Sequence, residues 1–453
     1  MSDKKPHFWK VKERNTFLTH FTQLVGGTAF AQALSVLILP ILTRLYTPED
    51  FSVLALYASM LAVISAIACL RFEIAIPIAE TEKVALDLFA LAAISSVAIV
   101  FTLVLVLGVA STLDVQYLSS TNLGYYVWLL PVGVFLSGAY AALQFLATRK
   151  RKFVEIRRTR VRQSLGAASV QVGFGLIGAG PIGLLLGQII NGGAGALGLF
   201  FSVLKEDLNK LKQIKKEDLV RTANEYSRFP KYSVTEALAN VGGMQLPIAI
   251  IAAFVAGPEA GIVMLAFRIM GAPINLIGGA MSQVFLSRAP IALKEGKLQA
   301  LALTVQAGVL KTGLGPLLFI GAVAPVFVPY AFGAEWARMG VVIQWMTPWF
   351  MMQFLTSPVS MVLHVANRQG SALVLQAFGF VIRVGGVLLA SLWFPVYVAE
   401  SYAVASFVFY FVYFVVILRI LGINIRSFVV SQRKSFAIFT LWVFISFLAI
   451  KYI

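Results

Sequence analysis

The sequence has little charge and almost no cysteine. Charged residues make up 13% of the 453 residues, hydrophobic residues make up 59%, and the mean hydropathy is +0.85. This composition excludes a soluble globular protein and is typical of a chain that crosses a membrane many times. The single cysteine, Cys69, lies inside an apolar run, so the sequence excludes both an internal disulfide and a cysteine-rich metal site.

Residue patterns that carry catalysis are equally scarce. The three histidines, His7, His20 and His364, have no matched acidic or nucleophilic partner in the sequence. There is no metal-ligand spacing and no phosphate-binding glycine motif, so we expect neither a metal nor a cofactor. The expected extracellular loops are too short to hold a catalytic domain. The sequence therefore predicts that the protein is not an enzyme.

Long apolar runs fill the chain. A helix needs about 20 apolar residues to cross a bilayer core, and proline, glycine and charge clusters mark the breaks between runs. We expect an all-α protein with twelve spans, and the stretch at 435–450 either forms a thirteenth span or is re-entrant. The twelve lie at 17–42, 50–72, 84–109, 124–148, 163–179, 181–203, 233–256, 259–286, 300–325, 340–364, 370–394 and 396–418.

The basic residues set the expected orientation. Lysine and arginine outnumber aspartate and glutamate by 37 to 20, and with a cytoplasmic N-terminus 30 of the 37 fall in segments on the cytoplasmic side. Cytoplasmic loops of membrane proteins carry this excess of basic residues. Because the charge sits in short loops between apolar runs, we expect no nucleic-acid partner, despite the net charge of +17.

A long polar interval divides the chain into two halves. We expect an N-terminal lobe at 1–204, a cytoplasmic linker at 205–232, a C-terminal lobe at 233–421 and an extension at 422–453. Leucine and isoleucine recur in the linker at roughly helical spacing among lysines and acids. This pattern indicates either a helix lying in the membrane interface or a solvated linker.

The two halves share landmarks in the same order. Thr47-Pro48-Glu49 starts the second span and Gly257-Pro258-Glu259 starts the eighth. Proline suits the first turn of a helix, and glutamate favours the positive end of the helix dipole. Six spans per half is an even number, so both halves enter from the same side. A pseudo-two-fold axis along the membrane normal should relate them, as in many transporters.

Three basic residues lie deep inside predicted spans. Arg268, Lys311 and Arg383 are roughly 14–20 Å from the start of their spans at 1.5 Å per residue, and no acid lies at similar depth in the second half. Each such cation costs about 2.5–3.5 kcal/mol unless it faces water or a partner. The cations either snorkel as structural residues or line a polar cavity. Such a cavity would suit an anion, because arginine binds phosphate through a bidentate fork.

Further polar residues could complete such a cavity. Asn240, Gln245 and Asn275 offer hydrogen-bonding groups suited to a hydroxyl-rich ligand, or they join helices to one another. Arg71 stands at the cytoplasmic end of the second span, two residues before Glu73, where it is placed to pair with that acid.

An ordered set of short motifs resembles a known family, the Wzx-type lipid-linked polysaccharide (O-antigen) flippases. These form the polysaccharide transport branch of the multidrug/oligosaccharidyl-lipid/polysaccharide exporter superfamily. The resemblance covers residues 20 to 420 and is carried by Leu42 to Phe51 (LTRLYTPEDF), Leu70 to Glu73 (LRFE), Thr148 to Phe153 (TRKRKF), Arg228 to Pro230 (RFP), Gln245 to Pro247 (QLP), Arg268 to Pro273 (RIMGAP) and Ser282 to Phe285 (SQVF) with Ser287 to Ala289 (SRA).

The resemblance implies a function. It implies translocation of an undecaprenyl-diphosphate-linked oligosaccharide from the inner to the outer leaflet of the bacterial cytoplasmic membrane. The substrate and membrane lipids would be its partners, together with other polysaccharide-assembly proteins. Arg268 would contact the diphosphate, with Lys311 and Arg383 next, and Arg71 would guard cytoplasmic entry.

Three other functions compete with this one. A cation-coupled multidrug extruder of the same fold favours mid-span acids, which the sequence lacks. A membrane-embedded glycan polymerase or ligase needs an acid/base cluster and larger external loops. A scaffold of a glycan-assembly complex gives no reason for cations at the membrane midplane.

Overall fold

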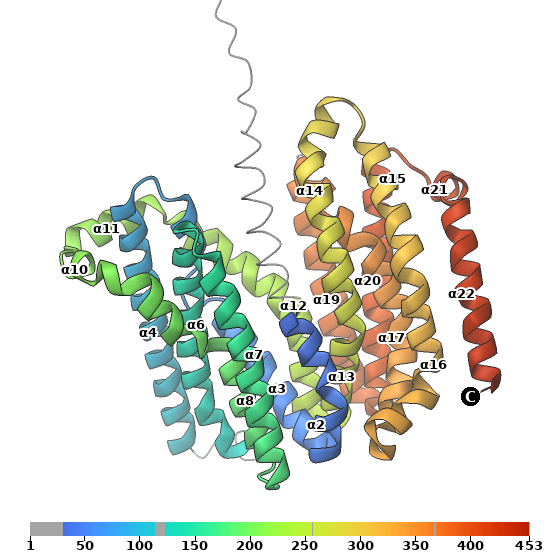
Figure 1. Ribbon diagram of the computed structural model, residues 1–453, viewed down its shortest axis with the longest axis horizontal. Coiled ribbons are helices and arrows are strands. Elements are labelled where there is room, and N and C mark those ends of the chain that lie inside the picture. Colours follow the sequence, from blue (N-terminus) through green and yellow to red (C-terminus); the bar gives the residue numbers. More distant parts are fainter. Residues whose placement is uncertain (1–29, 114–122, 256, 367, 453) are drawn as a thin grey trace, which may run out of the picture.

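The computed structural model describes residues 30–113, 123–255, 257–366 and 368–452. Throughout these ranges the regular structure is helical, and Figure 1 shows two groups of helices standing side by side. The first predicted span is described only from residue 30, and His7 and His20 lie outside the described residues. The predicted all-α class is confirmed for the part of the chain that is described.

The principal helices follow the predicted runs closely. The first group holds α2 (Leu39–Leu45), α3 (Pro48–Ser65), α4 (Glu82–Thr112), α6 (Leu129–Arg149), α7 (Phe153–Leu176), α8 (Ile182–Gly193) and α9 (Gly195–Leu199); the linker holds α10 (Leu208–Leu211) and α11 (Lys216–Glu225). The second group holds α12 (Val234–Phe254), α13 (Glu259–Pro273), α14 (Gly279–Lys294), α15 (Leu298–Val309), α16 (Gly315–Phe332), α17 (Ala337–Thr356), α18 (Val362–Val365), α19 (Gln369–Trp393) and α20 (Val398–Ile420), followed by α21 (Ile425–Ser431) and α22 (Arg433–Tyr452).

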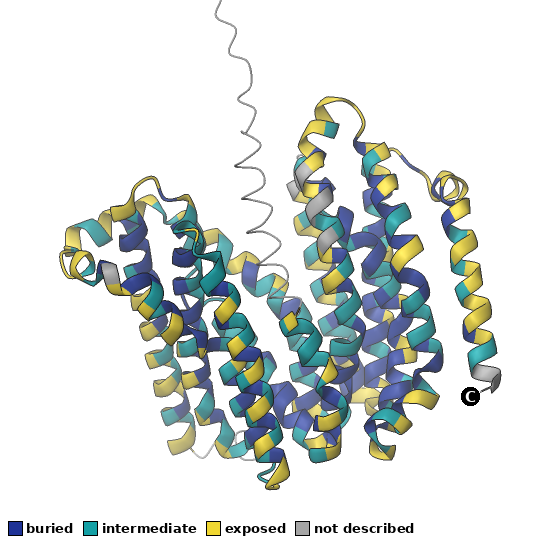
Figure 2. Cartoon of the chain, in the orientation of Figure 1, coloured by how far each residue is buried: buried dark blue, intermediate teal, exposed yellow. Residues whose placement is uncertain are grey.

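Many of the helices are long and apolar enough to span a membrane. Among the described residues, nine stretches pass this test by length and composition, and the bent pair of α21 and α22 makes a tenth. Figure 2 shows buried residues concentrated inside the two groups and exposed residues along their outer faces. Those outer faces carry large apolar side chains such as Phe101, which is 62% exposed. The chain is therefore a multi-pass membrane protein.

Several predicted span boundaries are wrong, and two of them have a clear physical reason. The sequence extends the second span to residue 72, but α3 ends at Ser65, and Leu70 and Arg71 take positive φ values that no helix allows. The sequence starts the fifth span at residue 163, but α7 already begins at Phe153. Arginine is a good helix former, so the arginines before residue 163 extend the fifth helix beyond its apolar part.

Helix α3 lies on the side of the first group that meets the second. It packs against α6 and α8 on one side and against α12 and α13 on the other. Thr47 caps its start, because its hydroxyl accepts a hydrogen bond from the Asp50 amide while the Asp50 carboxylate accepts one from the Thr47 amide. The main hydrophobic core accordingly contains residues of both groups, whereas a second core belongs to the first group alone.

The linker is helical and is bound to the first group. Lys83 at the start of α4 pairs with Asp218 of α11 at 2.9 Å, and Lys210 of α10 pairs with Glu82 at 2.9 Å. Lys150, just after α6, forms an ion pair with Asp207. These ion pairs hold the linker against the first group. The end of the molecule where α10 and α11 lie is called the linker end below (Figure 1).

The linker should detach at low pH. Burial alone would raise the pKa of Asp207, but hydrogen bonds and charge from Lys150 and Lys210 outweigh it and hold the pKa below its usual range. The stabilisation is complete above the unfolded pKa of about 3.9 and is lost as the pH falls through the folded pKa. Lys150→Ala should move this loss to higher pH, measured as pepsin cleavage within 205–225 between about pH 2 and pH 5. Identical cleavage profiles for the variant and the wild type would contradict the role given to Lys150.

The C-terminal extension folds back along the second group. The two helices α21 and α22 meet at a bend of 78°. α22 packs against α16, where Trp442 covers Gly315 and its ring lies 6.1 Å from that of Phe319. Its 20 residues correspond to about 30 Å of helix, which is about the thickness of a bilayer core.

Candidate functional site

One set of contacts between the two groups lies at the end opposite to the linker end. The hydroxyl of Ser52 on α3 donates to the carbonyl of Gly257 at 3.1 Å and accepts from the amide of Gly261 at 3.0 Å. The indole of Trp336, just before α17, donates to the carbonyl of Thr43 at 3.1 Å. These bonds use hydroxyl, indole and backbone groups without a charged partner, so each contributes about 1 kcal/mol.

Gly261 brings the backbones of α3 and α13 into direct contact. A Cβ atom at this position would lie 2.6 Å from both the Pro48 carbonyl oxygen and the Ser52 amide nitrogen. Backbone atoms cannot swing aside as a flexible side chain can, so a larger residue would force the two helices apart. The close approach therefore depends on glycine.

Two side-chain hydrogen bonds join the groups at greater depth. Ser59 on α3 donates to the Gln245 side-chain oxygen on α12 at 3.3 Å, and the Arg268 guanidinium on α13 donates to the Gln188 side-chain oxygen on α8 at 3.3 Å. Arg268 is nine residues along α13 from its start at Glu259, a depth of about 14 Å. Among the described residues of α3 and α8, no hydrogen bond reaches α12 or α13 closer to the linker end.

Arg268 has no acidic partner in the described part of the chain. Its side chain is partly buried and its recorded contact is the neutral amide of Gln188. A guanidinium has five N–H donors in a fixed fork, so most of its bonding capacity remains for another acceptor. Burial without a counter-charge favours an anion at this position.

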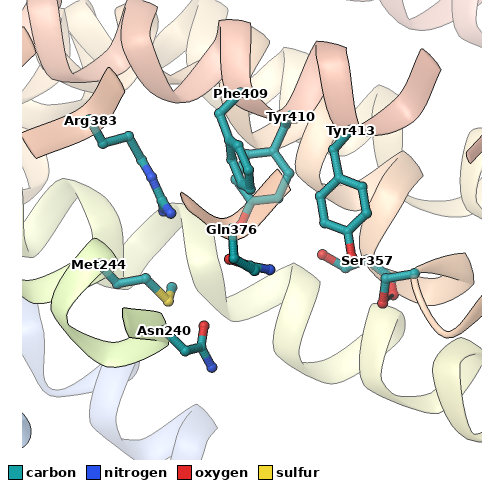
Figure 3. Close-up of a pocket in the computed structure, with 9 residues that line it drawn as sticks. Asn240, Met244, Ser357, Gln376, Arg383, Phe409, Tyr410 and Tyr413 are labelled. Atoms are coloured by element: carbon teal, nitrogen blue, oxygen red, sulfur yellow. Dashed lines mark hydrogen bonds between the residues drawn. The ribbon is translucent and has the colours of Figure 1, made fainter. Parts of the chain in front are cut away.

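A second buried arginine faces a cavity in the second group. Arg383 on α19 is 3% exposed; its Nε donates to the Gly379 carbonyl at 2.8 Å and its Cζ lies 4.5 Å from the centre of the Phe409 ring. The cavity has a volume of about 160 Å³ and opens between α12, η9 (Ser357–Val359), α19 and α20. Figure 3 shows Arg383, Gln376 and Asn240 directed into the same space.

The lining of this cavity is polar but has no carboxylate. Its other residues are Asn240, Met244, Ser357, Ser360, Gln376, Phe409, Tyr410 and Tyr413. Amides and hydroxyls offer both donors and acceptors, while Arg383 supplies the only full charge among the residues that line it. The volume is below the 300–1,000 Å³ typical of a drug-sized ligand, so it suits one anionic or hydroxyl-bearing group rather than a whole oligosaccharide.

The structure separates the other predicted site residues. Of the predicted set, Arg383 and Asn240 alone line this cavity. Gln245 bonds to Ser59, and Arg71 pairs with Glu73 at 3.5 Å. Asn275 and Lys311 are exposed and lie in the π-helical segments η6 (Ile274–Gly278) and η7 (Leu310–Leu314), a geometry frequent at functional sites.

Sequence reasoning missed two residues of these sites. Gln188 is one of several polar residues within the predicted spans, and the sequence gives no sign that it meets Arg268. Gln376 lies in an apolar run without a distinguishing motif. Its position seven residues before Arg383 places both on one face of a helix, which is the one signal that connects them.

An ion-pair triad stabilises the far end of the second group. Arg338 on α17 binds Glu400 on α20 through two bonds at 2.7 and 2.9 Å and Glu259 on α13 at 2.9 Å. Both carboxylates are mostly buried. Glu259, the glutamate of the repeated Pro-Glu motif in this half, thus takes part in ion pairs that link α13, α17 and α20. Its counterpart Glu49 in the other half is exposed.

Arg338→Ala should destabilise the protein strongly. The change leaves two partly buried carboxylates close together without a counter-charge, and breaking a buried pair costs about 3 kcal/mol. We expect a clear fall in the unfolding temperature of the detergent-solubilised protein. Adding Glu400→Gln should recover part of the loss, because it removes one of the unpaired charges; an unchanged unfolding temperature for Arg338→Ala would refute this role.

The chain resembles known membrane transporters in its fold. The lipid II flippase MurJ in an inward closed conformation superposes with a TM-score of 0.71 at 11% identity, covering 94% of this chain and 96% of the flippase. An inward-facing multidrug resistance MATE family transporter of the MOP superfamily gives 0.62 at 18% identity, covering 86% and 94%. A MOP superfamily transporter from Pyrococcus furiosus gives 0.51 at 16% identity, covering 89% and 95%.

The sequence itself identifies the family. No protein of curated function matches it. The profile described as "Polysaccharide biosynthesis protein" matches residues 41–341, which is more than half of the chain. Together with the fold, this match confirms the resemblance to the polysaccharide branch of the exporter superfamily. The chain belongs to the polysaccharide biosynthesis protein family and has the fold of the MOP superfamily transporters.

Proposed function

We propose that the protein is a flippase that moves an undecaprenyl-diphosphate-linked oligosaccharide across the bacterial cytoplasmic membrane. One observation carries the proposal: Arg268 lies between the two helix groups at mid-depth, partly buried, with a neutral amide as its partner. A permanent cation in this position costs about 2.5–3.5 kcal/mol unless an anion or water compensates it. The family and the transporter fold make a diphosphate the anion that fits best.

The linker end is the cytoplasmic end in this proposal. Most basic residues lie in the segments at that end, as the positive-inside rule requires. The contacts around Ser52, Gly261 and Trp336 then close the extracellular side, so the conformation is inward-facing. The similar MATE transporter is in an inward-facing conformation, and the similar MurJ flippase is in an inward closed one.

Transport then follows from rocking one lobe against the other around a fixed site. The lobes extend over 1–204 and 233–421, joined by the linker at 205–232. The diphosphate binds Arg268, while Arg71 lies near the cytoplasmic entrance and Lys311 offers a further charge. The amides Asn240, Gln245 and Asn275 bind sugar hydroxyls, Arg383 binds an anionic or hydroxyl-bearing group of the glycan, and the polyprenyl tail stays in the lipid.

Calorimetric binding to the purified protein tests this assignment. We expect farnesyl diphosphate to bind, and farnesol and the cationic dye ethidium to give no heat above dilution, because the buried arginines favour anions. Binding of ethidium without binding of farnesyl diphosphate would instead favour the cation-coupled multidrug extruder of the same fold. Absence of all binding by the folded protein would also count against the proposal.

A further inference from the structure

We propose that the Gln188 side chain accepts a hydrogen bond from Arg268 until the substrate arrives. Displacement of this amide by a phosphate then starts the opening of the extracellular side. This proposal rests on the proposed function and adds a positioning residue to it. The bond joins α8 of the first group to α13 of the second. Because it bridges the two groups, whatever breaks it also removes a link that keeps them closed.

A phosphate is a better acceptor for Arg268 than the amide is. The recorded bond is a single contact of 3.3 Å to a neutral oxygen. A phosphate offers an ionised oxygen pair that matches the planar guanidinium fork, and charge-assisted hydrogen bonds are roughly twice as strong as neutral ones. A substrate entering from the linker end therefore gains by displacing Gln188.

Gln188 is firmly attached to the first group. Its neighbours Leu184, Leu185 and Ile189 on α8 are buried, and Gly187 lies so close to Gln171 on α7 that a Cβ atom would come within 2.4 Å of that side chain. The amide therefore moves with the first group when the groups separate. Arg268 moves with the second, so the bond cannot survive the transition.

Other links remain once this bond is broken. At the same depth the Ser59–Gln245 bond joins α3 to α12 among the described residues, and α3 also packs against α12 and α13. The outer layer holds the bonds of Ser52 and Trp336 and one from the Arg44 guanidinium to the Tyr330 carbonyl at 3.3 Å. A hydrogen bond contributes about 1 kcal/mol net. Loss of the Arg268–Gln188 bond should therefore raise the outward-open population relative to the closed one by about fivefold.

The distance between the outer ends of the two groups measures this opening. Spin labels at Tyr125→Cys before α6 and Tyr397→Cys before α20 lie on exposed positions, 93% and 64% exposed, and Cys69→Ser removes the native thiol. Pulsed electron–electron double resonance then gives the distribution of distances between the two labels in nanodiscs. In the otherwise wild-type protein, farnesyl diphosphate should increase the population at longer distances, and farnesol should not.

Three variants isolate the role of Gln188. Gln188→Leu removes the acceptor and should raise the long-distance population about fivefold without ligand. Gln188→Glu supplies a permanent carboxylate to Arg268, so farnesyl diphosphate should no longer change the distances. Gln144→Leu is the matched control, because it breaks an Arg160–Gln144 bond of 2.9 Å that lies entirely within the first group; its distances should equal those of the wild type.

The outcomes separate this proposal from the proposed function. If Gln188→Leu matches the Gln144→Leu control without ligand, or if Gln188→Glu responds to farnesyl diphosphate as the wild type does, the role of Gln188 is refuted. Binding of the diphosphate in the calorimeter would leave the flippase assignment intact in that case. If the wild type binds no diphosphate, the flippase assignment fails, and the ligand-free comparison of the two leucine variants still decides whether the bond keeps the outer end closed.

Discussion

Replacing Arg268 by alanine should reduce transport about 100-fold, to the level of protein-free vesicles. A hydrogen bond to a charged group contributes about 1.5–3 kcal/mol, and an arginine holding a phosphate through its fork makes two of them. The variant also removes the mid-depth charge that attracts the anion. Because the arginine lacks an acidic partner among the described residues, its removal leaves no unpaired carboxylate behind, and the protein should fold and insert normally.

Two further variants make this result specific. Arg268→Lys keeps the charge but loses the bidentate geometry, so it should retain partial activity. Arg158→Ala removes an exposed arginine of α7 whose ion pair is with Glu155 one turn away, a contact worth at most about 1 kcal/mol, and should transport normally. Normal transport by correctly inserted Arg268→Ala would refute the site.

Gly261→Val should abolish transport by preventing closure of the outer end. The added side chain would meet the backbone of α3 at Pro48 and Ser52, where a Cβ atom alone already comes within 2.6 Å. Both partners are backbone atoms, so the helices must separate and the bonds of the Ser52 hydroxyl are lost. The protein should then stay open on its extracellular side.

Thiol labelling from outside the cell measures this change. A cysteine introduced at Ala55 in a Cys69→Ser background is buried on α3 one turn deeper than Ser52, so it leaves the Ser52 bonds intact. It should react slowly in the otherwise wild-type protein and quickly beside Gly261→Val. Gly108→Ala is the control, because nothing lies within 4 Å of its added Cβ atom; it should leave both labelling and transport unchanged. Slow labelling and normal transport in Gly261→Val would show that the contact does not control closure.

Composition and periodicity predict most of this fold because the membrane restricts it. A lipid-exposed backbone must satisfy its own hydrogen bonds, so apolar runs of sufficient length become helices. The runs at 84–109 and 370–394 correspond well to α4 and α19. The exceptions lie where the chain leaves the bilayer: water can satisfy the backbone there, and local φ preferences decide, as at Leu70 and Arg71 after α3.

The candidate site is less accessible to sequence reasoning. Depth along a helix follows from counting residues, which singled out Arg268 and Arg383. The direction of a side chain depends on how the helices pack, which no linear pattern records. The sequence therefore grouped Lys311 with these two, although it is exposed while Arg383 is buried. It also gave Gln188 no role, because its contact with Arg268 joins residues 80 positions apart.

The measurement that tests the account most directly is lipid translocation by the reconstituted protein. A fluorescent oligosaccharide on a polyprenyl diphosphate is placed in one leaflet of proteoliposomes, and its appearance in the other leaflet is followed with ion gradients and a membrane potential imposed. The account predicts translocation by the wild type and none above protein-free vesicles by Arg268→Ala. Absence of translocation by intact, correctly inserted wild-type protein, or equal rates for the two proteins, would contradict it.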